Sequence, residues 1–348
     1  MLLESLDLGM EVRALHVLIG LVLGAVFGIA AQISKFCLRR AVAGENGERG
    51  SAGAVWVTGL AVAIIGFLIA QATGFVALED HRFTSSTLPV AAVILGGLAF
   101  GVGMVLTRGC VSRLTVLSAS GNLRAVFVLL TFAVVTHATI KGVLAPLRTA
   151  LGSVTLEMPV GTLADLPFGL SALAALSVVA ALFLIRQSKP RLSHVALGGL
   201  VGLVAVAGWV ATSTLFFDEF DPLPVQTAAF TLPFSESLFW VIASTAIPAT
   251  FGVGFIGGVL GGSFLSAAAR GELKLQSFTS PGETLRYLSG GALMGVGGAL
   301  AGGCTVGAGL SGTATGSLAA ILTLLSIVAG ASLAARLARG AQGVPAAA

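Results

Sequence analysis

Long apolar stretches constrain the fold of this chain more than any other feature of its sequence. They run over 14–34, 53–72, 89–107, 123–146, 167–185, 195–215, 237–269 and 286–335. One crossing of a bilayer by an α-helix takes about 20 mostly apolar residues. Only 10% of the residues are charged, whereas soluble proteins contain about 25%. We therefore expect an all-α integral membrane protein, partnered by the lipid bilayer and not by nucleic acid.

Two of the apolar stretches are too long for a single helix. The stretch 237–269 contains Pro248 followed by a series of glycines, and the last stretch is interrupted from Gly302 to Gly316. Backbone that leaves the helical conformation at membrane depth is tolerated where it is buried or lines a cavity. We therefore expect about nine transmembrane helices plus re-entrant half-helices.

The loop charges predict an orientation. The connector 186–191 and the tail 336–339 carry only basic charged residues, whereas the connector 218–221 carries only acidic ones. Cytoplasmic loops carry an excess of Lys and Arg. The C-terminus is therefore expected in the cytoplasm, and the acidic start of the chain, with Glu4 and Asp7, on the periplasmic side.

An internal repeat divides the chain into two halves. Gly96–Cys110 aligns without gaps on Gly290–Cys304, with five glycines and the final cysteine in register at an offset of 194. The loop charges place the starts of these units on opposite sides, so the units run in opposite senses. Inverted repeats with broken helices indicate a transporter whose site lies near the bilayer midplane. We expect an inverted pseudo-two-fold repeat with halves 1–190 and 191–348.

A weaker similarity links two series of glycines at an offset of 234: Gly20, Gly24 and Gly28 with Gly254, Gly258 and Gly262. The alternative to a repeat is that both series are small-residue faces for close helix packing. Both interpretations stay open on the sequence alone.

Each of the three cysteines, Cys37, Cys110 and Cys304, follows a stretch that can end a helix and precedes one that can start another. The positive end of a helix dipole at such a break favours an anion. Gly109 and Gly303, directly before two of the cysteines, allow backbone N–H groups to approach a ligand. The alternative is that the cysteines are small buried apolar residues. With no close pair among them, they predict neither a disulfide framework nor a metal site.

Basic residues flank two of the cysteines. Lys35 lies beside Cys37, and Arg108 and Arg113 flank Cys110. We expect them to attract an anion, although basic residues near helix ends also serve as cytoplasmic anchors. His137 and Lys141, one turn apart within an apolar span, are second-rank candidates because ionisable residues inside membranes are usually functional.

The segment Gln32–Cys37 (QISKFC), the glycine-rich units that end at Cys110 and Cys304, and Arg270–Phe278 (RGELKLQSF) together resemble the YeeE/YedE family of bacterial inner-membrane sulfur transporters. The resemblance implies thiosulfate uptake through an hourglass-shaped helical protein in which the three cysteines contact the ion through S–H···S hydrogen bonds. It also implies a small cytosolic TusA-like sulfur-carrier protein as a partner. The family motif usually has Arg at the position of Lys35. The lysine of this chain keeps the positive charge but cannot bind an anion in the bidentate geometry of Arg.

We predict a transporter, not an enzyme, that imports thiosulfate or a similar small sulfur anion and needs no cofactor or metal. One alternative is a membrane sulfurtransferase or thiol-redox protein in which a cysteine forms a persulfide; no Cys-x-x-Cys motif or soluble catalytic domain favours it. Another is a membrane anchor for a sulfur carrier that transports nothing.

Overall fold

A computed structural model describes residues 11–45, 47–76, 78, 81–215 and 223–342. The long helices are α2 (Val12–Ser34), α4 (Glu48–Ala72), α5 (Val90–Leu106), α7 (Leu123–Lys141), α9 (Gly169–Ser188), α10 (Leu192–Val210), α12 (Phe251–Ala269), α13 (Pro281–Leu300) and α14 (Leu318–Gln342). The shorter ones are α3 (Leu38–Ala43), α6 (Val111–Ala119), α8 (Ala145–Gly152) and α11 (Thr231–Ile242). A 3₁₀ turn, η1 (Leu163–Asp165), and two π-helical turns, η2 (Ala211–Leu215) and η3 (Gly307–Gly312), lie between them. The acidic N-terminal residues Glu4 and Asp7 and the acidic connector 218–221 lie outside the described residues.

The all-α membrane fold is confirmed. In the described part of the chain, eight helical segments are long and apolar enough to cross a membrane: α2 with α3, α4, α5 with α6, α7, α9, α10 with η2, α12 and α14. About nine were expected. The helix α13 is not among the eight, because Glu283 and Arg286 in its first two turns lower its hydropathy. The only paired strands described are β1 (Thr87–Leu88) and β2 (Leu156–Glu157), which join two loops.

Both expected helix breaks are present. The helix α11 ends at Ile242 and α12 begins at Phe251, with Pro248 between them and the Thr250 hydroxyl accepting a hydrogen bond from the Val253 N–H at 3.4 Å. The segment between α13 and α14 contains the π-helical turn η3 and two glycines with positive φ, Gly302 at 72° and Gly316 at 75°. Only glycine adopts this left-handed backbone without strain, so the glycine run ends one helix and starts the next.

The helices pack through glycine. The helices α2 and α12 run parallel, with Gly20 against the backbone of Phe251 and Gly28 against that of Val259; a Cβ atom at either glycine would overlap the other helix. The glycine series of α2 and α12 are therefore the two faces of one close helix contact, as the packing interpretation predicted. The helices α4 and α10 pack in the same parallel way.

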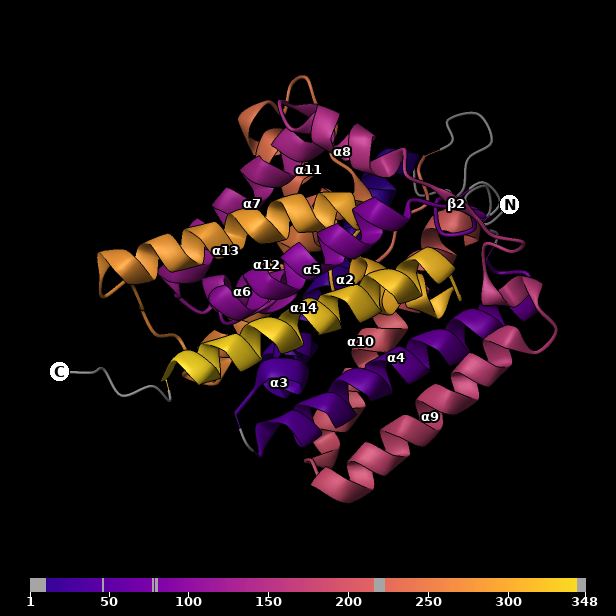
Figure 1. The fold of residues 1–348 in the computed structure, drawn as a ribbon, viewed down its shortest axis with the longest axis horizontal. Helices are drawn as coiled ribbons and strands as arrows, with labels where there is room; N and C mark the ends of the chain where they lie inside the picture. Colours follow the sequence, from indigo (N-terminus) through magenta and orange to yellow (C-terminus); the bar gives the residue numbers. More distant parts are fainter. Residues whose placement is uncertain (1–10, 46, 77, 79–80, 216–222, 343–348) are drawn as a thin grey trace.

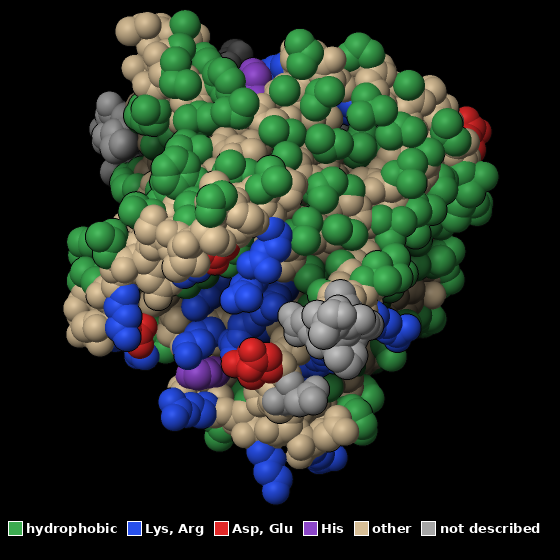
Figure 2. Space-filling model, turned by 60° about the vertical axis from the view of Figure 1, so that its left-hand side comes forward, with side chains coloured by type: hydrophobic (Ala, Val, Ile, Leu, Met, Phe, Trp, Pro, Cys, Tyr) green, Lys and Arg blue, Asp and Glu red, His purple; other side chains and the backbone are tan. Residues whose placement is uncertain are grey.

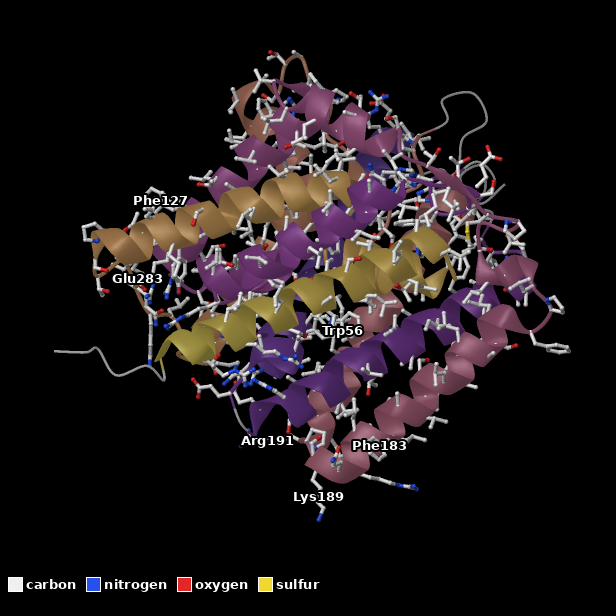
Figure 3. All side chains as sticks on the ribbon, viewed as in Figure 1. Trp56, Phe127, Phe183, Lys189, Arg191 and Glu283 are labelled. Carbon is white, nitrogen blue, oxygen red and sulfur yellow. The ribbon has the colours of Figure 1, made fainter. Side chains whose placement is uncertain are left out.

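The helices α5, α13 and α14 lie side by side in the middle of the molecule (Figure 1). The helices α5 and α13 run antiparallel: Gly96 packs on Gly297, and Gly103 packs on Gly290. The helices α4 and α9 form one edge, and α8 and α11 lie at the opposite edge. Figure 3 shows Phe183 on the outer side of α9, where it is 63% exposed. Exposed apolar side chains on an outer helix fit a lipid-facing surface.

Candidate functional site

Cys37 and Cys110 meet at two helix breaks. Lys35, in the left-handed conformation with φ 54°, ends α2, and Cys37 is the N-cap residue of α3. Arg108, also left-handed with φ 57°, follows α5, and Cys110 is the N-cap residue of α6. The two sulfur atoms lie 3.7 Å apart, so that one thiol can donate a hydrogen bond to the other. Both side chains are buried, at 2% and 1% exposure.

Cys304 lies at the third break, between α13 and η3. Its sulfur accepts a hydrogen bond from the backbone N–H of Gly307 at 3.3 Å, and its side chain is fully buried. The backbone N–H groups of Arg40 and Arg113, each three residues beyond a cysteine, approach Cys37 and Cys110 in the corresponding way. All three cysteines belong to one continuous buried cluster.

The two glycines before the cysteines have different surroundings. A Cβ atom at Gly303 would lie 2.8 Å from the backbone nitrogen of Ala308, which cannot move without disturbing the turn. A Cβ atom at Gly109 would lie 3.3 Å from the side chain of Leu114, which can shift. Gly303 is therefore required by the fold of its break, and Gly109 is not required to the same degree.

The expected basic residues separate into two groups. Arg113 is close to both Cys37 and Cys110, and its Nη1 atom is buried without a hydrogen-bond partner among the described residues. Lys35 and Arg108 are exposed at the surface. Arg113 is therefore the one of the three that reaches the pair of thiols from inside the protein.

A basic face lies on the side of the molecule next to Cys37 and Cys110. We define it as the basic residues whose charges act on Glu48, on His194 or on Cys37: Lys35, Arg39, Arg40, Arg113, Arg191 and Arg270. Figure 2 shows Lys and Arg side chains gathered in a hollow on one side of the molecule, bordered by apolar surface. Two carboxylates lie within it: Glu48 pairs with Arg40 at 3.0 Å and Glu272 with Arg270 at 2.9 Å.

Two arginines near Cys304 were not expected from the sequence. Arg82, from the loop before β1, and Arg148, from α8, line a cavity of about 200 Å³ together with Thr231 and the backbone of Gly303 and Gly307. The Nε atom of Arg148 and the hydroxyl of Thr231 are buried with no hydrogen-bond partner in the described structure. Unpaired buried donors are costly unless a ligand satisfies them. We refer to this space as the arginine cavity.

The arginine cavity adjoins a second space of about 490 Å³, which shares Arg82 and Gly307 with it and adds His81 and Trp209. Burial and the neighbouring Arg82 lower the pKa of His81 to about 4, so its ring is neutral near pH 7. The positive charge of this region therefore comes from the arginines. Its apolar wall is made by Phe83, whose ring lies 4.8 Å from the Arg82 guanidinium, and by Trp209.

His137 and Lys141 lie together on α7, but apart from the thiols. The Nδ1 atom of His137 is 3.0 Å from the Ser235 hydroxyl on α11, and its ring stacks on Phe239 at 3.7 Å. Lys141 is exposed at the end of the helix. These contacts join α7 to α11.

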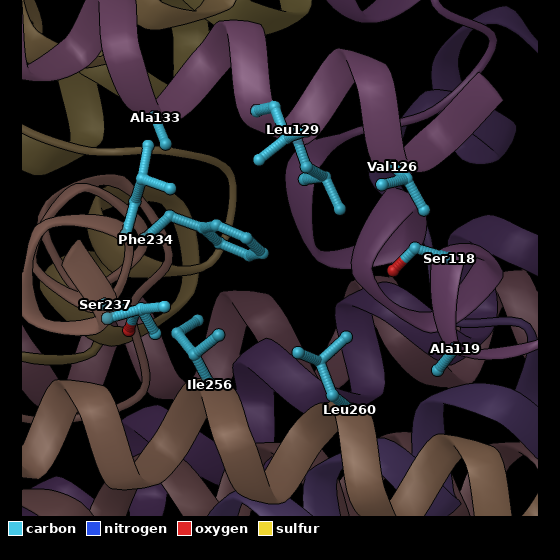
Figure 4. Close-up of a pocket in the computed structure, with 12 residues that line it drawn as sticks. Ser118, Ala119, Val126, Leu129, Ala133, Phe234, Ser237, Ile256 and Leu260 are labelled. Carbon is cyan, nitrogen blue, oxygen red and sulfur yellow. The ribbon is translucent and has the colours of Figure 1, made fainter. Parts of the chain in front are cut away.

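Another pocket, of about 350 Å³, is apolar and lies between α7, α11 and α12. Figure 4 shows Leu129 and Val126 from α7, Phe234 from α11, and Ile256 and Leu260 from α12 around it. Pockets that fix an anion need precisely placed polar groups. This pocket has mostly hydrocarbon walls and does not suit an anion.

Comparison with known proteins identifies the family of this chain. The sequence model of the Sulphur transport family matches residues 33–333. This chain belongs to that family, also called YeeE/YedE. It is 27% identical over 330 residues to a protein of Escherichia coli K12 named thiosulfate transporter TsuA, covering 86% of this chain and 88% of the relative. It is 26% identical over 329 residues to a protein of the same name from Spirochaeta thermophila, covering 89% and 96%.

Proposed function

We propose that this protein carries thiosulfate, or a similar small sulfur-containing anion, across the bacterial inner membrane into the cytoplasm. The observation that carries the proposal is the location of three buried thiols at three helix breaks, between the arginine cavity and the basic face. The names of the two relatives favour thiosulfate as the substrate. The anion would meet Cys304 first and then the pair Cys110 and Cys37.

The mechanism follows from the chemistry of the two ends. Arg82 and Arg148 attract the dianion, and the unpaired Thr231 hydroxyl offers it a hydrogen bond. Neutral thiols then pass the anion along by weak S–H donation, while Arg113 compensates its charge beside Cys110. Conduction requires sites that bind strongly enough to admit the ion and weakly enough to release it. The thiols must stay protonated, because a thiolate would repel the anion.

The proposal includes an inverted two-fold repeat of the halves 1–190 and 191–348. Reciprocal contacts support it: α5 packs on α14 as α13 packs on α7, and α2 packs on α12 as α10 packs on α4. Within the α5–α13 pair, Gly96 meets Gly297 while their aligned counterparts, Gly290 and Gly103, meet each other. A two-fold axis between two units produces this exchange of contacts.

This packing favours α10 as the counterpart of α2, and α11 as the counterpart of α3. Phe230, the N-cap residue of α11, then takes the position that Cys37 takes before α3. Phe230 is fully buried, and its ring lies 5.4 Å from that of Phe27 in α2. The repeat thus supplies four equivalent positions, three with a thiol and one with a phenyl ring.

The proposed orientation has the basic face in the cytoplasm. Lys189 and Arg191, at the connection of α9 and α10, lie at the same end of the molecule as α3 (Figure 3). Excess Lys and Arg mark cytoplasmic loops. If α13 crosses the membrane together with the eight apolar segments, the number of crossings is odd, and the two chain ends lie on opposite sides of the membrane. A TusA-like carrier that receives the sulfur would then meet the basic face.

Uptake of labelled thiosulfate into proteoliposomes tests the proposal. We expect the native chain to take up thiosulfate and Cys110→Ala, folded and reconstituted in equal amount, to take up none above empty vesicles. Failure of the folded native protein would refute thiosulfate transport. Equal uptake by both proteins would keep the transporter and refute the role of the thiols. A persulfide on Cys110 or Cys304 after exposure to thiosulfate would favour the sulfurtransferase alternative.

A further inference from the structure

The contact between Cys37 and Cys110 is more than transport requires. A relay needs each thiol to meet the anion, whereas these two sulfurs also meet each other, at 3.7 Å. A disulfide bond is about 2.05 Å long, so the sulfurs need to approach by roughly 1.6 Å. Both sulfurs belong to N-cap residues of short helices, where rotation about the Cα–Cβ bond moves the sulfur without moving a long helix.

We propose that Cys37 and Cys110 form a redox-active dithiol that tetrathionate, the oxidised dimer of thiosulfate, converts to a disulfide that closes the transport path. The first thiol loses its proton to solvent and attacks a central sulfur of tetrathionate. The central S–S bond breaks, one thiosulfate leaves, and a Cys–S–S–SO₃⁻ adduct remains. The second thiol loses its proton and attacks the cysteine sulfur of the adduct. A second thiosulfate leaves, so two thiols are oxidised and one tetrathionate is reduced.

The surroundings of the pair suit this reagent. Tetrathionate carries two negative charges and the same sulfonate ends as thiosulfate, so the cations that attract one attract the other. Arg113, with a buried unpaired Nη1 atom, lies close to both sulfurs. The Ser112 hydroxyl lies 3.3 Å from the Cys110 sulfur, and either group can donate the hydrogen bond between them. Cys304 lies apart from this pair of sulfurs, with the Gly307 N–H at its own sulfur, so it provides an internal control.

Oxidation closes the path for two physical reasons. A disulfide has no S–H group, so two of the three donors are removed from the path. The new covalent bond also ties the start of α3 to the start of α6, and the anion can no longer pass between them. Exchange with an added dithiol reverses both effects. The transporter would thus stop when its substrate pool is oxidised.

The proposed closure of the path rests on the proposed transport function, but the formation of the disulfide can be measured without measuring transport. Purified, reduced protein in nanodiscs is treated with tetrathionate, its free thiols are counted, and its peptides are mapped by mass spectrometry. We expect the thiols to fall from the three in the sequence to one, a Cys37–Cys110 cross-link, and two thiosulfates released per protein. The variant Cys304→Ser should give the same cross-link, and Cys37→Ser should retain a thiosulfate adduct on Cys110. Three surviving thiols, or adducts without a cross-link in the native chain, would overturn the proposal.

The second arm measures uptake by the same samples in proteoliposomes. We expect the cross-linked protein to lose uptake and to regain it after reduction with dithiothreitol. A quantitative cross-link with undiminished uptake would overturn the closure. If the reduced native protein takes up no thiosulfate, the proposed function fails, whereas the thiol count still decides whether the dithiol exists.

Discussion

The breaks before α6 and before η3 follow nearly the same glycine-rich helix, yet their cysteines have different neighbours. Cys110 faces a second thiol, with Arg113 beside it and the basic face beyond. Cys304 faces the backbone N–H of Gly307, next to a cavity with two arginines. The same motif therefore produces a confined thiol pair at one end of the site and the arginine cavity at the other. We propose that the anion is captured in the arginine cavity and passes along the thiol pair.

Substituting a thiol of the Cys37–Cys110 pair is the strongest way to test this division. We expect Cys110→Ala to reduce the uptake rate more than about tenfold, equivalent to at least about 1.4 kcal/mol of barrier. It should leave equilibrium binding of thiosulfate to detergent-solubilised protein almost unchanged, because the arginine cavity is intact. If the variant lost binding in parallel with uptake, the two regions would act as one site. Radiolabelled uptake and isothermal titration calorimetry measure the two quantities.

Neutralising the arginine cavity should have the next largest effect. Hydrogen bonds to charged groups contribute about 1.5–3 kcal/mol, so Arg148→Gln is expected to raise the KM for thiosulfate by about tenfold or more. The maximal rate should change little. The matched control is Lys189→Gln, which removes an exposed charge that points away from the molecule in Figure 3. Equal changes in both variants would contradict a specific role for the cavity.

The same two regions can be compared through the glycines that precede their cysteines, Gly109 and Gly303. Gly303→Ala places a methyl group 2.8 Å from the Ala308 backbone nitrogen, so we expect a loss of about 1–3 kcal/mol of stability. Gly109→Ala meets only side chains, those of Leu114 and Arg113, and should cost less. Thermal unfolding in detergent, followed by intrinsic fluorescence, ranks the two variants. The reverse ranking would contradict the described geometry of the breaks.

The smallest expected effect concerns pH. The pKa of His81 is lowered to about 4 from 6.5, so the folded protein favours the neutral ring and the unfolded chain binds the proton more readily. The free energy of unfolding that the neutral His81 ring contributes is fully present above about pH 6.5 and is lost as the pH falls toward 4. We expect the unfolding midpoint to fall less over that interval in His81→Gln than in the native chain. Identical profiles would show that His81 is not buried beside Arg82.

The sequence predicted the parts of this protein that depend on local chain properties. Apolar length predicted the spans. Pro248 and the glycines from 302 to 316 predicted the two breaks, because proline removes a helix hydrogen bond and glycine can adopt the left-handed backbone at which a helix ends. The apolar stretch 286–335 included most of α13, although Glu283 and Arg286 make the start of this helix less apolar than the other spans. The orientation, the repeat and the cysteine-lined path remain proposals.

The candidate site was predictable only where its residues adjoin a motif. Cys37 and Cys110 were singled out, but their contact joins positions 73 residues apart and depends on how α2 packs beside α6. Arg82 lies in a loop and Arg148 in the short helix α8, neither within a motif, and the arrangement of α8 against α5, α7 and α13 brings Arg148 to the cavity beside Cys304. Only the tertiary arrangement carries this information.

Protection of the cysteines by substrate tests the central claim, that the path runs past the thiols, most directly. A small neutral alkylating reagent is applied to the native protein at increasing thiosulfate concentration, and the modified fraction of each cysteine is measured by mass spectrometry. We expect thiosulfate to slow alkylation of Cys37, Cys110 and Cys304, with half-maximal protection near the KM for uptake. Alkylation of all three at unchanged rates, while the same protein transports thiosulfate, would contradict it.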